Sequence, residues 1–164
     1  MNKLVLLLDR NSKLNVAQAG RKAGSLSELL RAGFPVPPGI CLTVSAFELA
    51  LRPYQAAIKA FLREPETGTG EISELLAGWT LPQAIRTRLF ERLPQLGAPD
   101  LGFAVRSSAV HEDGTDSSFA GQYTTILGVK SERDIETAVL DCYRSYFSAQ
   151  AIAARAVADA ENGP

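Results

Sequence analysis

The sequence predicts a mixed α+β fold. Strand-like and helix-like segments alternate irregularly along the chain, and no segment repeats another. The chain has 164 residues, of which 46% are hydrophobic and 21% charged, which is typical of one soluble domain with a core of its own. Glycine and proline gather at a few places and mark the ends of the predicted elements. We therefore expect a single α+β (mixed α/β) domain.

The N-terminal part begins with a short apolar run. Residues 4–8 are predicted to form a buried strand, and the polar residues 11–23 a loop. Ser25 and Glu28 have the spacing of a capping box, in which each side chain accepts from a backbone amide near the helix start. The helix that they open is predicted to end at Gly33, which tolerates a left-handed conformation.

A second strand and helix follow. Residues 40–44 are rich in apolar and β-branched side chains and are predicted to form a strand. Ser45 and Glu48 form a second capping box, and the helix after them carries apolar residues along one face as far as Phe61. Pro53 is predicted to kink or split this helix.

The C-terminal half contains more helices and a second pair of strands. Four segments are predicted from periodicity, namely helices at residues 72–76 and 82–93 and strands at residues 101–105 and 123–129. Ser131 is then predicted to cap a long, alanine-rich amphipathic helix that extends from about residue 132 to about residue 160.

Charge and cysteine usage exclude several classes of function. Lys and Arg number 17 and Asp and Glu 18, giving a net charge of −1, which argues against nucleic-acid binding and against a polybasic membrane surface. No apolar stretch is long enough for a signal peptide or a bilayer span, so we expect a cytoplasmic location. Cys41 and Cys142 lack metal-binding or redox spacing and are predicted to be small buried thiols.

Lys22 is the first candidate for function. It lies between Gly20 and Gly24, just before a predicted helix start, where an ammonium group and exposed amides together favour a phosphate. The segment does not have the spacing of a Walker P-loop. The alternative interpretation is a solvated lysine in a turn.

Arg106 is the second candidate. It lies where an apolar strand meets a polar loop, and its planar guanidinium suits phosphate oxygens. The hydroxyls of Ser107 and Ser108 and the amide of Gly121 are candidates to complete an anion site. The alternative is an arginine that pairs with an acidic residue of the following loop, with the serines serving as turn formers.

That loop contains Glu112 and Asp113, the acidic candidates for such a pairing, and Asp116. Three clustered carboxylates suit Mg²⁺, but the Asp-Gly-Thr-Asp sequence is also ordinary turn chemistry, which we favour. His111 is the one histidine of the chain and is predicted to lie on the surface. We therefore predict no metal site within the chain.

These segments, taken in order, resemble a known family. The opening pattern "GGKGANL…GPVPPGF" of phosphoenolpyruvate synthases, pyruvate, phosphate dikinases and rifampicin phosphotransferases resembles residues 20–26 and 33–39. Their later pattern "VRSSA..ED…SFAGQ..T.L" resembles residues 105–109, 112–113 and 118–122, followed by Thr125 and Leu127. Two composite motifs in the right order are more specific than either alone.

The resemblance implies that residues 1–164 form the N-terminal subdomain of an ATP-grasp nucleotide-binding domain. In that family the domain phosphorylates a histidine on a separate swivelling domain, which passes the phosphoryl group to pyruvate or to an antibiotic. By motif, Lys22 and Arg106 would hold the phosphates of ATP. The nucleotide site would also include Ser107, Ser108, Gly121, Gln122 and Thr125. The Mg²⁺ ligands would lie in the second half of the grasp.

Departures from the family pattern shape the remaining expectations. Arg21 and Ala23 replace glycines that are usual beside the lysine. The chain ends before the second grasp subdomain, the phosphocarrier histidine domain and the acceptor domain that would be its partners, so we expect the isolated chain to be inactive. An antibiotic phosphotransferase and a non-catalytic binding module are the alternatives. The presence of both Lys22 and Arg106 weighs against the latter.

Overall fold

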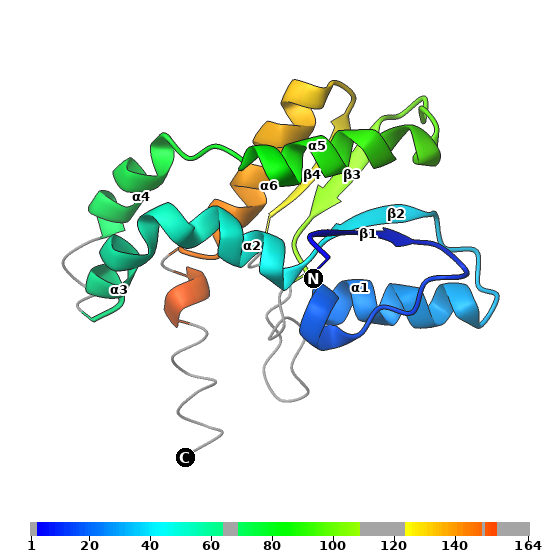
Figure 1. The fold of residues 1–164 in the computed structure, drawn as a ribbon, viewed down its shortest axis with the longest axis horizontal. Helices are drawn as coiled ribbons and strands as arrows, with labels where there is room; N and C mark the ends of the chain where they lie inside the picture. Colours follow the sequence, from blue (N-terminus) through cyan, green and yellow to red (C-terminus); the bar gives the residue numbers. More distant parts are fainter. Residues whose placement is uncertain (1–2, 64–68, 109–123, 149, 154–164) are drawn as a thin grey trace, which may run out of the picture.

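A computed structural model describes residues 3–63, 69–108, 124–148 and 150–153 of the chain, and it has the expected α+β architecture (Figure 1). In chain order its strands and helices are β1 (Val5–Leu8), α1 (Val16–Arg31), β2 (Gly39–Leu42), α2 (Val44–Leu51), α3 (Gln55–Arg63), α4 (Thr69–Ala77), α5 (Gln83–Arg92), β3 (Phe103–Arg106), β4 (Thr125–Val129) and α6 (Glu132–Ser145). None of the described helices is long and apolar enough to cross a membrane.

The strands form two small antiparallel sheets. β1 pairs with β2, with Val5 opposite Leu42, and α1 and α5 contact this pair from opposite sides (Figure 1). β3 pairs with β4, with Arg106 opposite Thr125, and α6 packs against this second pair. The two pairs lie next to each other, so that the end of β3 reaches α1 (Figure 1).

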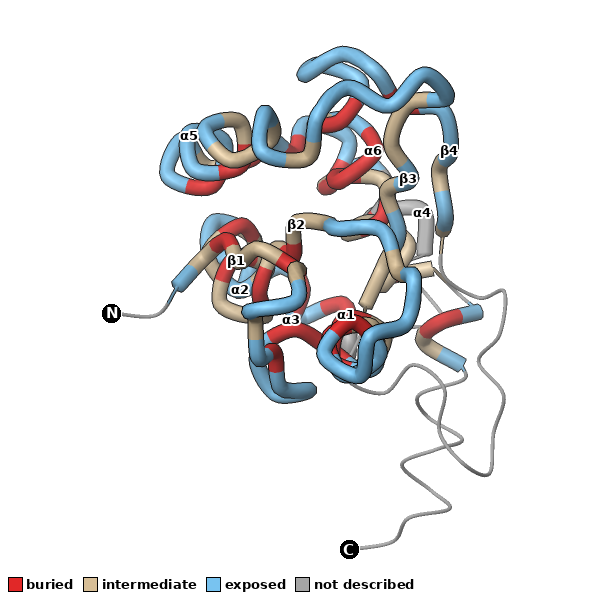
Figure 2. Tube along the Cα trace, turned by 90° about the vertical axis from the view of Figure 1, so that its right-hand side faces the viewer, coloured by how far each residue is buried: buried red, intermediate tan, exposed pale blue. Residues whose placement is uncertain are grey.

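The hydrophobic core has two parts. The larger part is built from α2 to α6 and the strands, and its buried residues include Ile85 and Trp79. The smaller part lies between α1 and the β1–β2 pair, and contains Leu30 and Cys41. Figure 2 shows buried residues of α1, α5 and α6 on the sides that turn toward the centre of the molecule. The helices therefore cover the strands by burying one face each, as amphipathic helices do.

Several local predictions are confirmed. α1 ends with Gly33 at φ +88°, where the amide of Phe34 donates to the Leu29 carbonyl at 3.0 Å, the hydrogen bond of a Schellman motif. Pro53 lies in a short 3₁₀ turn that separates α2 from α3, so the predicted helix is split. The Ser131 hydroxyl caps α6 by accepting from the Asp134 amide at 3.1 Å.

Both predicted capping boxes are wrong. α1 begins nine residues before Ser25, and its cap is Asn15, whose side chain accepts from the Gln18 amide at 2.9 Å, so the predicted loop at 11–23 is mostly helix. α2 is capped by Thr43 rather than Ser45. Thr43 is favoured because its hydroxyl also donates to the Lys3 carbonyl at 2.9 Å, a contact across the sheet that local spacing does not reveal.

The long C-terminal helix also differs from the prediction as far as residue 153, and residues 154–160 of the predicted helix lie outside the described residues. α6 ends at Ser145 and a turn follows, with the Phe147 amide donating to the Arg144 carbonyl at 2.9 Å. Phe147 is thereby buried in the core, and Ser148 caps a further helical turn by accepting from the Ala151 amide at 3.2 Å. Burial of the aromatic ring explains why the helix does not continue unbroken.

Candidate functional site

Helix α1 is interrupted at Gly20. This residue has φ +76° and ψ 169°, a conformation that residues with a side chain rarely adopt, and helical geometry continues on both sides of it. The second stretch, which extends to Arg31, therefore has an N-terminus of its own inside α1. Lys22 lies in its first turn, so the backbone of Lys22 lies at the positive end of a helix dipole.

The end of β3 packs against this interruption. The Ser108 hydroxyl donates to the Ala19 carbonyl at 2.8 Å and accepts from the Ala23 amide at 2.9 Å. A Cβ atom placed on Gly20 would lie 1.5 Å from the Ser108 carbonyl oxygen, so only glycine permits this approach. The two motifs, more than 80 residues apart in the sequence, therefore meet at one point.

The β3–β4 pair brings further predicted residues to the same region. Arg106 is opposite Thr125 in the antiparallel register, and both residues are exposed, whereas Val105 and Ile126 contact the larger core. Lys22 and Ser107 are half-buried, and each already has a contact within the protein. The structure thus groups Lys22, Arg106, Ser107, Ser108 and Thr125 where β3 meets α1.

Other predicted residues lie outside the described residues. These are Gly121 and Gln122, the acidic loop residues Glu112, Asp113 and Asp116, and His111. Across the described ranges, no three His, Cys, Asp or Glu side chains are grouped so that they could hold a metal ion. The role of Gly20 is not evident from the sequence, because a glycine beside Arg21 and Lys22 is typical of a loop and does not by itself indicate a break within a helix.

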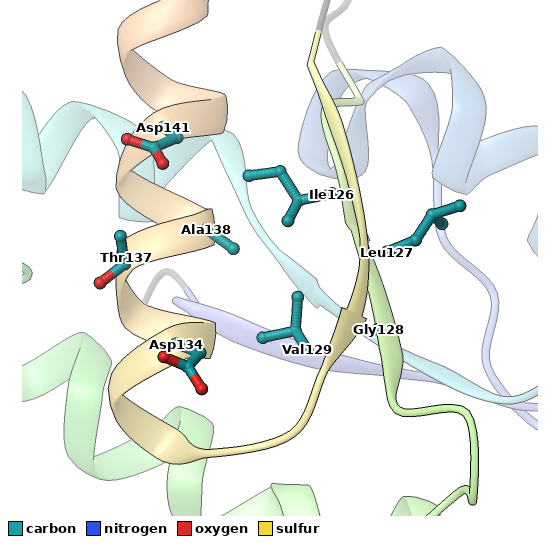
Figure 3. A pocket seen from close by; sticks show the side chains of 8 residues that line it. All are labelled: Ile126, Leu127, Gly128, Val129, Asp134, Thr137, Ala138 and Asp141. Atoms are coloured by element: carbon teal, nitrogen blue, oxygen red, sulfur yellow. The ribbon is translucent and has the colours of Figure 1, made fainter.

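Two hollows of the surface lie elsewhere. The smaller, of about 290 Å³, lies between β4 and α6, where Ile126 and Val129 point toward the helix and Leu127 points away from it (Figure 3). Its charged lining residues, Asp134 and Asp141, are both acidic, which does not suit a phosphate. The larger, of about 870 Å³, is lined by β1 and the starts of α1 and α2, and its charged side chains are of both signs. Neither hollow is lined by Lys22 or Arg106.

Cys41 lies on β2 behind the interruption of α1, with its sulfur 3.7 Å from the Ala19 carbonyl. Cys41 and Cys142 are buried thiols, as predicted. Burial raises the pKa of the Cys41 thiol from 9.0 to about 12, because the thiolate would lose its hydration. Burial also raises the pKa of Tyr143, whose hydroxyl has no hydrogen-bond partner among the described residues.

The raised pKa of Cys41 predicts that the fold loses stability in alkali. Above pH 9 the thiol ionises in the unfolded chain but stays protonated in the folded one, so the free energy of unfolding falls as the pH rises. Between pH 8 and pH 10 we expect the free energy of unfolding to fall by about 1.4 kcal/mol more in the unmodified chain than in Cys41→Ala. Urea unfolding at the two pH values measures this difference. An equal fall in the free energy of unfolding of both proteins would contradict a raised pKa of Cys41 in the folded chain.

Comparison with known proteins identifies relatives of this chain. Residues 16–162 match the protein family described as "Pyruvate phosphate dikinase, AMP/ATP-binding domain". The matched range includes both motifs that meet at Gly20.

Individual relatives agree with this match. A probable phosphoenolpyruvate synthase of Methanothermobacter thermautotrophicus is 32% identical over 93% of this chain and 24% of its own length. The phosphoenolpyruvate synthase of Aeropyrum pernix is 31% identical over 93% of this chain and 20% of its own length. The prodigiosin synthesizing transferase PigC of Serratia marcescens is 34% identical over 90% of this chain and 16% of its own length. The chain thus spans a quarter or less of these relatives.

Proposed function

This chain belongs to the family of pyruvate phosphate dikinase AMP/ATP-binding domains, and from this premise we propose that it is the ATP-binding part of a phosphotransferase similar to phosphoenolpyruvate synthase. Residues 1–164 would form the N-terminal subdomain of an ATP-grasp domain. The remaining parts of the enzyme would be a second grasp subdomain, a phosphocarrier histidine domain and an acceptor-binding domain.

One observation carries the proposal. The hydrogen bonds of Ser108 with Ala19 and Ala23 hold the motif of Lys22 against the motif of Arg106. A phosphate chain carries several negative charges, and it is bound where cationic side chains and a helix N-terminus converge. Lys22 would supply an ammonium group, and the stretch of α1 that begins after Gly20 would supply the positive end of its helix dipole. Arg106 would supply an exposed planar guanidinium.

The proposed chemistry is positioning and charge neutralisation. Lys22 and Arg106 would hold the phosphate oxygens of ATP, and Thr125 would line the site beside Arg106, together with Ser107, Gly121 and Gln122. A phosphoryl group of ATP would pass to a histidine of the phosphocarrier domain and from there to pyruvate. Bound Mg²⁺ would neutralise phosphate charge, but the described residues offer it no cluster of ligands, and we place its ligands elsewhere in the enzyme.

A second acceptor is supported by one of the relatives. The Serratia protein named as a prodigiosin synthesizing transferase is as similar to this chain as the phosphoenolpyruvate synthases are. Transfer to an acceptor other than pyruvate, including an antibiotic, would use the same ATP site. The identity of the acceptor would therefore be a property of other domains.

ATP titration of the purified chain tests the proposed site. We expect ATP to bind, and Arg106→Ala to weaken binding by roughly 10- to 100-fold, because hydrogen bonds to charged groups are worth about 1.5–3 kcal/mol. Arg88→Ala is the matched control, since Arg88 is an exposed arginine on α5, and we expect its affinity to stay within about twofold of the unmodified chain. Calorimetry measures all three affinities.

Two results would count against the proposal. Absence of ATP binding by the unmodified chain would remove the site from this chain while leaving its family membership intact. Equal losses in Arg106→Ala and Arg88→Ala would indicate attraction by net charge alone. We expect the purified chain not to hydrolyse ATP. If the unmodified chain hydrolysed ATP and Lys22→Ala did not, the isolated chain would already be an enzyme.

A further inference from the structure

The Ser108 hydroxyl occupies an unusual place in the backbone of α1. In an unbroken helix the amide of Ala23 would donate directly to the carbonyl of Ala19, four residues earlier. Here the hydroxyl lies between the two groups, donating to the Ala19 carbonyl at 2.8 Å and accepting from the Ala23 amide at 2.9 Å. A side chain from the segment after β3 thus replaces one hydrogen bond of the helix with two.

We infer that Ser108 is a positioning residue that holds Lys22 in place for ATP, rather than a ligand of the nucleotide. This inference rests on the proposed function. A serine hydroxyl has a single hydrogen to donate, and that of Ser108 is directed to the Ala19 carbonyl. A phosphate oxygen needs a donor, so the hydroxyl cannot bind phosphate and close the helix break at once.

Lys22 depends on this hydroxyl because it lies inside the closed ring. The backbone from Ala19 to Ala23 includes Lys22, and the Ser108 hydroxyl joins its two ends. Loss of the hydroxyl would leave the buried Ala23 amide without its acceptor and the Ala19 carbonyl with the weakly donating Cys41 thiol at 3.7 Å. The first turn that carries Lys22 would then be free to rotate.

Arg106 is coupled to Lys22 by the same contact. Only two peptide units separate Arg106 from Ser108, so the hydroxyl fixes the end of β3 relative to α1. The close approach of Gly20 to the Ser108 carbonyl leaves no space for the two segments to slide past one another. Two cations whose backbones are held at a fixed separation bind a polyphosphate at a lower ordering cost than two cations on independent segments.

A double-mutant cycle separates positioning from direct binding. NMR titration, which reaches millimolar dissociation constants, gives the ATP affinity of the unmodified chain, Ser108→Ala, Lys22→Met and the double variant. We expect Ser108→Ala to weaken ATP binding about tenfold when Lys22 is present and less than about twofold in the Lys22→Met background. Ser108→Thr keeps the hydroxyl and is expected to restore the affinity to within about threefold.

Two further measurements guard against a general loss of structure. Ser131→Ala removes a serine cap of the same kind from α6, and it is expected to lower the melting temperature by about 2–4 °C with unchanged ATP affinity. Amide hydrogen exchange at Ala23 reports the cap itself, and protection should fall in Ser108→Ala and return in Ser108→Thr. If Ser108→Ala does not fold, Ser108→Cys keeps the shape with a weaker hydrogen-bonding group.

The outcomes distinguish the two proposals. The positioning role would be overturned if Ser108→Ala lowered the ATP affinity equally with Lys22 present and in the Lys22→Met background, or did not lower it at all. Either result would leave the ATP site itself intact. A chain that binds no ATP would overturn the proposed function, and the positioning role with it. Unchanged exchange at Ala23 in Ser108→Ala would also overturn the positioning role, because the cap would then not depend on this hydroxyl.

Discussion

Gly20→Ala is expected to lower the free energy of unfolding by roughly 3–5 kcal/mol, more than a single added methyl group normally costs. The first reason is conformational, since φ +76° with ψ 169° is a backbone region essentially restricted to glycine, in which an alanine is strained by about 1–3 kcal/mol. The second is steric, because the new Cβ would lie 1.5 Å from the Ser108 carbonyl oxygen. That oxygen belongs to the backbone, so relief of the clash requires the end of β3 to move away from α1.

Gly33→Ala is the matched control for this variant. Gly33 has a similar φ of +88°, but nothing lies within 4 Å of the position that its Cβ would take. We expect Gly33→Ala to lower the free energy of unfolding only by the conformational strain of the alanine, about 1–2 kcal/mol. Urea unfolding of both variants measures the difference, which isolates the contact between α1 and β3. Similar losses in the two variants would mean that the contact contributes nothing to stability.

Gly20 also marks the limit of what the sequence could predict. Pro53, Gly33 and the cap at Ser131 act on their own neighbours in the chain, and the local pattern predicted all three effects correctly. Gly20 and Ser108 act on each other across a separation of 88 residues, and the local pattern of the glycine-rich segment predicts only a loop. No local pattern could indicate that a serine hydroxyl would bridge a break in a helix.

The same distinction applies to the functional residues. The chemistry of Lys22 and Arg106 could be predicted from their neighbours, because an ammonium group near a helix start and a guanidinium at a strand end are recognisable separately. That they lie at one place depended on the β3–β4 register and on the Ser108 contact, which are tertiary features. The error at Ser45 has the same origin, since the contact of Thr43 with the Lys3 carbonyl favours Thr43 as the cap. The error at Ser25 is local, because Asn15 caps α1 by accepting from the Gln18 amide three residues along the chain.

Trp79→Ala is expected to lower the free energy of unfolding by about 3–5 kcal/mol. Trp79 is 2% exposed and follows α4, where its ring centroid lies 5.7 Å from that of Tyr143 on α6 and 6.4 Å from that of Phe47 on α2. Its indole nitrogen donates to the Ala50 carbonyl of α2 at 2.9 Å. One side chain thus joins three helices of the larger core, and its removal would leave a large cavity and an unpaired carbonyl.

Two variants separate the contributions of the ring and of its hydrogen bond. Trp79→Phe keeps an aromatic ring but has no donor for the Ala50 carbonyl, and we expect it to cost about 1–2 kcal/mol. Phe34→Ala removes an aromatic ring that is 55% exposed, and we expect a change of less than about 1 kcal/mol. Because Trp79 is the one tryptophan of the chain, unfolding must be followed by circular dichroism rather than by tryptophan fluorescence. If Trp79→Ala cost no more than Phe34→Ala, the aromatic contacts around Trp79 would not hold the helices together, and the packing of α6 would have to rest on its contacts with β3 and β4.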